Sequence, residues 1–245
     1  MAQTVLGSAL ILIAVAIAGI SYYAALTPVG VGISAFFQEG APGAGGGIDS
    51  SKAATASRVA TAISRAESST GSQFPLVRSF SAAKDMSLIG VGVRKKAIIN
   101  VYSVGIYGAK QVVRVVEAKA GEYARCHAIV EKNLKTSRAA LLKFNMAVTA
   151  EKMADAMSAV EGPSQEIKDT FTAMLVKGIG GKLTKGEEMT FEWKGTNTVV
   201  LTARGVSIGE IKDKALFQGL LEIYLGENSV SPSLKKDIAA FTSSK

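Results

Sequence analysis

Hydrophobic and polar positions first set apart the N-terminal end of the chain. The first 38 residues carry no charged side chain, and Val5 to Leu26 form a continuous apolar run that is long enough to span a bilayer as a helix. Tyr22 and Tyr23 stand near one end of it, where an interfacial aromatic belt is expected. We therefore expect residues 1–27 to be a transmembrane anchor. The alternative is a cleaved signal peptide, which the length of the run and the lack of a preceding Lys or Arg disfavour.

A segment without a core-forming pattern comes next. Residues 28–72 are rich in Gly, Ala and Ser, and Gly40 to Gly47 read GAPGAGGG. Such a composition buries little apolar surface and is typical of a flexible tether. Within it, Ser50 to Ser69 has apolar residues at loose helical spacing, so that it is either an amphipathic helix or a partly ordered linker. We place the folded domain at residues 73–245.

Strand patterns dominate the first half of that domain. Apolar, β-branched and aromatic residues predict strands at 86–93 and 97–107, and alternation predicts a hairpin later in the chain. The segment 110–118 fits a strand and a helix equally well. The remaining predicted strands are 128–133, 140–147, 189–193, 198–203 and 206–211.

Helix-start signals follow the strands. Thr149, Ser164, Asp213 and Ser231 each precede a stretch with an apolar face at helical spacing, and Pro232 suits the first turn of the last one. Strands come first, helices lie in the middle, a hairpin follows and helices end the chain. This order predicts an α+β fold in which helices pack on an antiparallel sheet.

Composition and charge narrow the function classes. The formal net charge of +8 favours anionic partners, but the basic residues are scattered and no aromatic-studded basic stripe indicates nucleic-acid binding. The single cysteine, Cys126, excludes an intrachain disulfide, and a zinc site would need more ligands than Cys126 and His127 supply. On a strand these two neighbours would point to opposite faces, which argues against a nucleophilic pair. Neither a metal nor another cofactor is expected.

The candidate chemistry lies around the first two strands. Arg94 belongs to the basic cluster between them, and Tyr102 stands on the second strand. A guanidinium presents paired donors to a carboxylate, and a phenol adds one more. Gly90 and Gly92 lack the rest of any nucleotide-binding fingerprint, so that we assign them to a bulge or a close backbone approach.

Several motifs resemble the chalcone isomerase superfamily. They occur in the family order over residues 73–245 and comprise GVGVRKK (90–96), VYSVGIY (101–107), TAEKM (149–153), LEIYLG (221–226) and VSP (230–232). The resemblance implies an open-faced sandwich, a large antiparallel β-sheet with a layer of α-helices on it and a ligand cleft between them.

The resemblance also implies roles for single residues. The family holds isomerases and non-catalytic fatty-acid-binding relatives, and in both an Arg, here Arg94, holds an anionic oxygen. Tyr102 replaces the Thr of the enzymes, as it does in the fatty-acid binders. Thr149 and Ala156 fall on the Tyr and Asn that organise the enzyme's cleft, and Phe217 falls on the substrate-selecting position. Ala156 and Phe217 offer no side-chain hydrogen bonds.

The sequence thus predicts a membrane-anchored, non-catalytic chalcone isomerase-like protein that binds a fatty acid or a similar amphiphilic carboxylate through Arg94, Tyr102 and Thr149. No catalytic residue is predicted, and an enzyme is disfavoured. The alternatives are an isomerase of the intramolecular-lyase type and an assembly subunit of a membrane complex with a vestigial cleft. A single-pass membrane protein of a plastid or mitochondrion is the expected localisation.

Overall fold

The computed structural model describes residues 63–131 and 134–242. Its strands are β1 (Ser64–Ala66), β2 (Gln73–Pro75), β3 (Val77–Arg78), β4 (Met86–Lys96), β5 (Ile99–Gly108), β6 (Arg138–Phe144), β7 (Val148–Thr149), β8 (Lys182–Leu183), β9 (Glu188–Lys194), β10 (Thr198–Ala203) and β11 (Val206–Lys212). Its helices are α2 (Lys110–Glu117), α3 (Glu122–Val130), α4 (Ala150–Ser158), α5 (Gln165–Ile179), α6 (Lys214–Leu225) and α7 (Pro232–Ala239).

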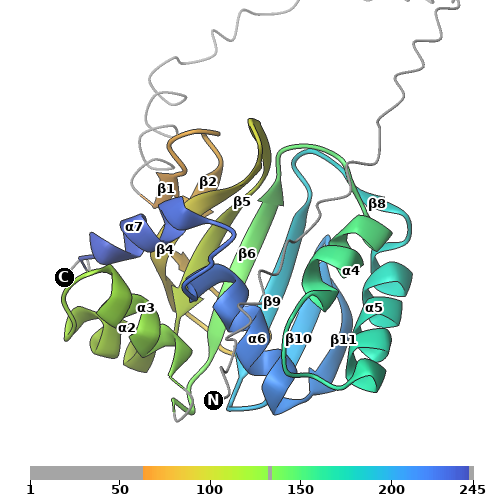
Figure 1. The fold of residues 1–245 in the computed structure, drawn as a ribbon. Helices are drawn as coiled ribbons and strands as arrows, with labels where there is room; N and C mark the ends of the chain where they lie inside the picture. Colours follow the sequence, from red (N-terminus) through yellow and green to blue (C-terminus); the bar gives the residue numbers. More distant parts are fainter. Residues whose placement is uncertain (1–62, 132–133, 243–245) are drawn as a thin grey trace, which may run out of the picture. The chain divides into compact units, whose positions relative to one another are not determined.

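One curled antiparallel sheet organises these elements (Figure 1). The strand order is β11-β10-β9-β6-β5-β4-β3, and each neighbouring pair is antiparallel. Two small two-stranded pairs, β1 with β2 and β7 with β8, stand apart from it. Most strands that are neighbours in the sheet also follow one another among the strands of the sequence. The exception is the pair β6 and β9, which are separated along the chain by β7, α4, α5 and β8.

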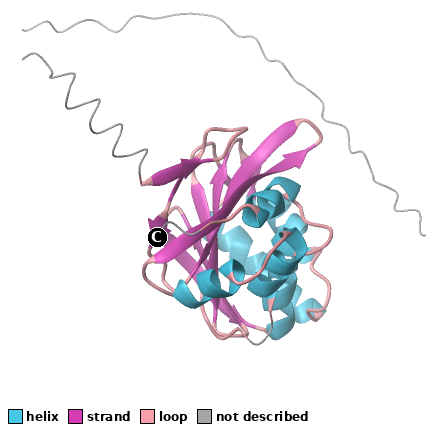
Figure 2. Ribbon diagram, turned by 90° about the vertical axis from the view of Figure 1, so that its left-hand side faces the viewer, coloured by secondary structure: helices cyan, strands magenta, loops and turns pink. Residues whose placement is uncertain are grey.

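The helices form a layer on one face of the sheet (Figure 2). The main core lies between this layer and the inner residues of the strands, among them Val104, Leu142 and Phe191, all of which are fully buried. A smaller cluster around Phe74 and Tyr107 covers part of the opposite face. The α+β prediction of an antiparallel sheet with a helical layer is therefore confirmed for the described residues.

The strand prediction at 128–133 is wrong. Residues 122–130 form α3, and residues 110–117 of the ambiguous segment form α2. Ile129 and Val130 are buried with Val112 and Val116 of α2, so that these β-branched residues pack on a neighbouring helix. A short apolar run with two buried sides looks the same in a strand and in a helix, and here tertiary packing decides.

Three of the four predicted helix starts carry a side-chain cap. The side chains of Thr149, Ser164 and Asp213 each accept a hydrogen bond from a backbone N–H in the first turn of α4, α5 and α6. Ser231 precedes α7, but its hydroxyl makes no cap bond and donates to the carbonyl of Val93. Its role is thus to attach α7 to β4.

The ordered fold begins ahead of residue 73. Residues 64–66 form β1, which pairs with β2, and the intervening turn is held by Glu67, a 3% exposed carboxylate that accepts hydrogen bonds from Ser69 and Thr70. The predicted anchor, 1–27, and most of the predicted linker lie outside the described residues. Within the described ranges, no helix is both long enough and apolar enough to cross a bilayer.

Helix α7 completes the edge of the sheet beside β4, where β3 pairs over two residues only. The backbone N–H of Val91 donates to Asp237 Oδ2 at 2.7 Å, and that of Val93 donates to Ser233 Oγ at 3.0 Å. Ser231 Oγ donates to the carbonyl of Val93 at 3.0 Å. Side chains of a helix therefore satisfy strand groups that another strand would otherwise bond.

Gly90 and Gly92 allow this helix to approach. A Cβ on Gly92 would lie 2.4 Å from the backbone nitrogen of Leu234, and one on Gly90 would lie 2.5 Å from Ile238 Cγ1. The β4–β5 register also shifts between Leu88 and Gly90. The bulge and the close backbone approach, which the sequence left as alternatives, both occur.

A three-membered charge cluster lies on the opposite face. Glu188 of β9 accepts from Arg78 Nη1 at 3.0 Å and pairs with Lys143 Nζ at 2.8 Å. Burial acts to raise the pKa of Glu188, but the two cations outweigh it and bring this pKa below its ordinary value of 4.5. A carboxyl with a lower pKa in the folded than in the unfolded state stabilises the fold above the unfolded-state pKa. That contribution disappears as the pH falls through the folded-state value.

We expect Glu188→Gln to lower the free energy of unfolding at neutral pH by about 1 kcal/mol, the scale of a partly exposed ion pair. The difference from the unsubstituted chain should shrink as the pH falls below 4.5. Urea unfolding across this pH range measures it. Glu210→Gln is the control, because Glu210 stands 4.0 Å from Lys212 on an exposed surface. A difference that persists undiminished in acid would contradict the assignment.

Candidate functional site

Arg94 and Tyr102 lie directly opposite each other on β4 and β5. Opposed residues of an antiparallel pair share a face of the sheet, and here both side chains turn to the helical side. Arg94 Nη1 donates to the Tyr102 hydroxyl at 3.3 Å, and the guanidinium carbon stands 5.7 Å from the centre of the Tyr102 ring. The cationic and the phenolic group that the sequence singled out are thus in contact.

Tyr224 of α6 adds a second phenol to this pair. Its hydroxyl lies 3.3 Å from the Tyr102 hydroxyl, and its side chain is fully buried. Burial raises the pKa of Tyr224 well above its ordinary value, and Tyr102 adds to this effect. Tyr224 therefore keeps its proton at neutral pH, and its hydroxyl can donate a hydrogen bond to an anion.

The charge of Arg94 has no carboxylate partner among the described residues. Burial acts to lower its pKa, but Tyr102 and Tyr224 reverse this, so that the pKa is raised and the guanidinium stays charged. Arg94 is half-buried, so that it is neither fully exposed nor closed off from solvent. A half-buried cation without a counter-ion, next to two phenols, is an arrangement suited to binding an anion.

Thr149 is engaged elsewhere. Its hydroxyl accepts from the backbone N–H of Lys152 at 3.3 Å and caps α4, and its backbone pairs with Lys182 between β7 and β8. The structure shows no hydrogen bond between Thr149 and Arg94 or Tyr102. Thr149 as a ligand-binding residue stays a prediction.

Phe217 lies at the other end of α6. It precedes Tyr224 by seven residues, or about 10 Å along the helix axis. Its ring stands 5.7 Å from the guanidinium carbon of Arg138, and its carbonyl accepts from the indole nitrogen of Trp193 at 3.1 Å. Arg138 is 1% exposed, and its Nη2 donates to two loop carbonyls. Phe217, which the resemblance places at the substrate-selecting position, therefore carries a ring that packs in the core.

Apolar side chains pack around Tyr102 in the main core. The ring of Phe144 stands 5.7 Å from that of Tyr102, and Met153 and Met157 of α4 are buried in the same core. Methionine has three rotatable bonds and adapts its shape at small energetic expense.

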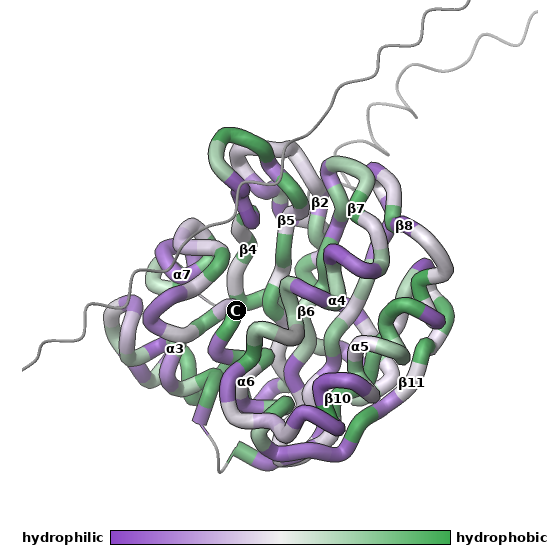
Figure 3. Tube along the Cα trace, turned by 45° about the vertical axis from the view of Figure 1, so that its right-hand side comes forward, coloured by the Kyte–Doolittle hydropathy of each residue, from purple (hydrophilic) through white to green (hydrophobic). Residues whose placement is uncertain are grey.

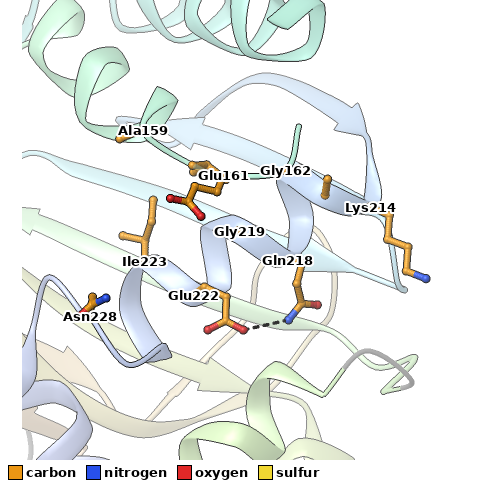
Figure 4. A pocket seen from close by; sticks show the side chains of 11 residues that line it. Ala159, Glu161, Gly162, Lys214, Gln218, Gly219, Glu222, Ile223 and Asn228 are labelled. Atoms are coloured by element: carbon orange, nitrogen blue, oxygen red, sulfur yellow. Dashed lines mark hydrogen bonds between the residues drawn. The ribbon is translucent and has the colours of Figure 1, made fainter. Parts of the chain in front are cut away.

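Two hollows of the described surface adjoin α6. One, of about 660 Å³, opens between the end of α4 and α6 and is lined by apolar groups with Glu161, Gln218 and Glu222 around it (Figure 4). The other, of about 370 Å³, includes Cys126 and His127. Neither is lined by Arg94 or Tyr102.

The second hollow does not form a nucleophilic site. Burial raises the pKa of Cys126 to about 11, which keeps it a thiol at neutral pH. His127 is exposed and stacks on Tyr123 with ring centres 5.8 Å apart. The adjacent residues diverge as the sequence analysis expected, although on a helix and not on a strand.

Tyr224 is the site residue that the sequence analysis missed. It lies on the apolar face of the helix that was predicted to start after Asp213, and its ring is buried there. Its hydroxyl is a polar group at a buried position, and such a group needs a partner. That requirement was the available signal, but the identity of the partner depends on how α6 crosses β5.

Fold and site together define an open-faced α+β sandwich with an Arg–Tyr pair on the helical side of its sheet. The chain belongs to the chalcone isomerase-like family, whose model matches residues 66–239. Among solved structures it is similar to a fatty-acid-binding protein of Arabidopsis thaliana, with a TM-score of 0.59 at 19% identity over 72% of this chain and 95% of that one. No curated protein sequence matches the chain.

Proposed function

We propose that this protein is a non-catalytic member of its family that binds a fatty acid or a similar amphiphilic carboxylate. Arg94 and Tyr102 hold the carboxylate, Tyr224 supports Tyr102, and the acyl chain lies between the sheet and the helices α4 and α6. The similarity to a fatty-acid-binding protein supports the ligand class.

One observation carries the proposal. Arg94 is charged and half-buried, has no carboxylate partner among the described residues and donates to Tyr102 at 3.3 Å. A carboxylate would supply the missing counter-charge and accept two N–H groups of the guanidinium at once. Tyr102 and Tyr224 offer hydroxyl hydrogens to the same oxygens.

The groups that an isomerase needs are missing from the corresponding positions. Transition-state stabilisation requires polar groups directed at the developing charge. Ala156 has no polar side-chain group, the Thr149 hydroxyl caps α4, and Phe217 packs against Arg138. Burial raises the pKa of Tyr224 well above its ordinary value, which makes this phenol a poor acid near neutral pH.

The test compares a carboxylate with its uncharged analogue. The purified chain is stripped of lipid, and the binding of palmitate and of methyl palmitate is measured by native mass spectrometry. We expect palmitate to bind at least about tenfold more tightly, because the ester cannot pair with Arg94. Equal binding of the two would refute the carboxylate clamp. Ring closure of a chalcone above the uncatalysed rate would instead identify an isomerase.

We further propose that residues 1–27 anchor the protein in a membrane as a single span, in a plastid or a mitochondrion. The uncharged run from Val5 to Leu26 supports this. Resistance of the full-length chain to alkaline carbonate extraction, with loss of that resistance on deletion of residues 1–27, is the expected result. Release of the full-length chain by carbonate would refute the anchor.

A further inference from the structure

The turn between β4 and β5 carries a hydrophobic stretch at its tip, next to a hydrophilic one (Figure 3). Ile98 is 94% exposed and Ile99 is 52% exposed, and Ala97 separates them from the exposed Lys95 and Lys96. Most surface isoleucines are singly scattered, whereas these two are adjacent and stand at the end of a hairpin. We name residues 95–99 the hairpin tip.

The backbone of the tip is unusual for a hairpin turn. Lys96 pairs with Ile99, so that Ala97 and Ile98 form a two-residue turn, and Ala97 has a φ of 53°. Such turns favour Gly, Asn or Asp, because a Cβ is disfavoured at positive φ. The tip therefore departs from the residues that would best stabilise a water-exposed turn. Strain of this kind at an exposed position points to a binding role.

The neighbouring loops extend the same surface. The backbone N–H of Asn145 donates to the carbonyl of Val101 at 3.0 Å, which places Met146, 38% exposed, beside the base of the hairpin. Lys185 is exposed at the same end of the sheet, since Gly186 bonds Phe144. This rim of the sheet combines exposed apolar side chains with lysines.

We propose that the hairpin tip inserts into the interfacial region of an anionic lipid bilayer. The lysines would lie among the negatively charged headgroups. The apolar side chains would lie at the boundary between headgroups and acyl chains. Two isoleucines and a methionine fall far short of the roughly 1,000 Å² that a specific protein interface buries. Lysine is also depleted in such interfaces. The chemistry of the rim thus favours lipid over a protein partner.

The inference does not depend on the proposed ligand, but the two are compatible in space. Arg94 precedes Ile98 by four residues on the same hairpin, a distance of about 13 Å at most. An inserted tip would bring the Arg94–Tyr102 pair close to the lipid headgroups. An amphiphile whose carboxylate lies at that level would meet Arg94 first.

The test places a fluorophore at the tip. The full-length chain with Cys126→Ala and Ile98→Cys is labelled with an environment-sensitive dye and reconstituted in phosphatidylcholine vesicles with and without phosphatidylglycerol. We expect a shift of the emission to shorter wavelength, and quenching by lipids with spin-labelled acyl chains, in the anionic vesicles. Lys95→Glu with Lys96→Glu should abolish the shift, because each lysine contributes about fivefold to the affinity for an anionic surface.

The matched control carries the dye at Tyr123→Cys, an 80% exposed position on α3. That position should show the same emission in both vesicle types. Insertion is refuted if the Ile98 label keeps its aqueous emission in anionic vesicles or responds equally to neutral ones. A label that is shielded only as protein concentration rises, without lipid, would overturn the proposal in favour of self-association. A variant that fails to reconstitute is replaced by Ile98→Ser with the dye on Ile99→Cys.

Discussion

Replacing Arg94 with alanine should weaken fatty-acid binding by about 10- to 100-fold. A hydrogen bond to a charged group contributes about 1.5–3 kcal/mol, which corresponds to that range. The loss should fall on acids and leave the weak binding of the methyl ester unchanged, since the ester does not pair with a guanidinium. Titration calorimetry with the purified, lipid-stripped chain measures both. Tyr102→Phe should show a smaller loss, because it removes one neutral donor.

Lys95→Ala is the matched control for this experiment. Lys95 neighbours Arg94 in sequence and carries the same charge, but it is exposed and lies beyond the register shift between Arg94 and Lys95. If Lys95→Ala weakens binding as much as Arg94→Ala, the effect is one of general charge and not of a clamp. If Arg94→Ala leaves the affinity for palmitate unchanged, the proposed site is wrong.

The largest stability effect should come from Gly92→Ala, which we expect to lower the free energy of unfolding by about 3 kcal/mol. The added methyl group would lie 2.4 Å from the nitrogen and 2.6 Å from the Cα of Leu234, so that α7 must shift as a backbone unit. Shifting α7 also strains its bonds to Val91 and Val93. Urea unfolding followed by circular dichroism measures the change.

Gly90→Ala provides the comparison two residues away on the same strand. Its methyl group meets side-chain atoms of Ile238, which have more freedom to move than backbone, so that about 1 kcal/mol is expected. Adding Ile238→Ala should recover part of the loss at Gly90 but none at Gly92. Equal destabilisation by both glycine substitutions would contradict the backbone contact.

Periodicity was sufficient for most of the sheet and for the capped helices. The strands near 86–93, 140–147, 189–193 and 198–203 are present because each has one or both faces in a core. The failure at 128–133 is of a different kind. There the run of buried residues is too short for its period to be recognised, and contacts with α2 decide the outcome.

Only part of the candidate site could be predicted from the sequence. Arg94 and Tyr102 were chosen from a family resemblance, and their opposition across two strands follows from the register of one hairpin. Tyr224 joins them from 122 residues away along the chain. No local pattern encodes a contact at that separation, since it depends on where α6 crosses the sheet.

Ser231 is a second residue whose tertiary contact could not be predicted from the sequence. The sequence Ser-Pro at 231–232 correctly marks the start of a helix, but the hydroxyl bonds Val93 and not the first turn. A capping residue and a tertiary anchor have the same sequence signature. Which role Ser231 takes depends on the strand beside it.

The attachment of α7 to β4 has a consequence for association between molecules. Val91 and Val93 direct backbone groups outward from the sheet, and the side chains of Ser231, Ser233 and Asp237 bond them. A chain that ends before residue 231 would present this strand bare, as a template on which the strand of another copy can align. By covering this edge, α7 removes one template for strand pairing between copies. We expect removal of residues 231–245 to promote association of copies through β4, which light scattering would measure.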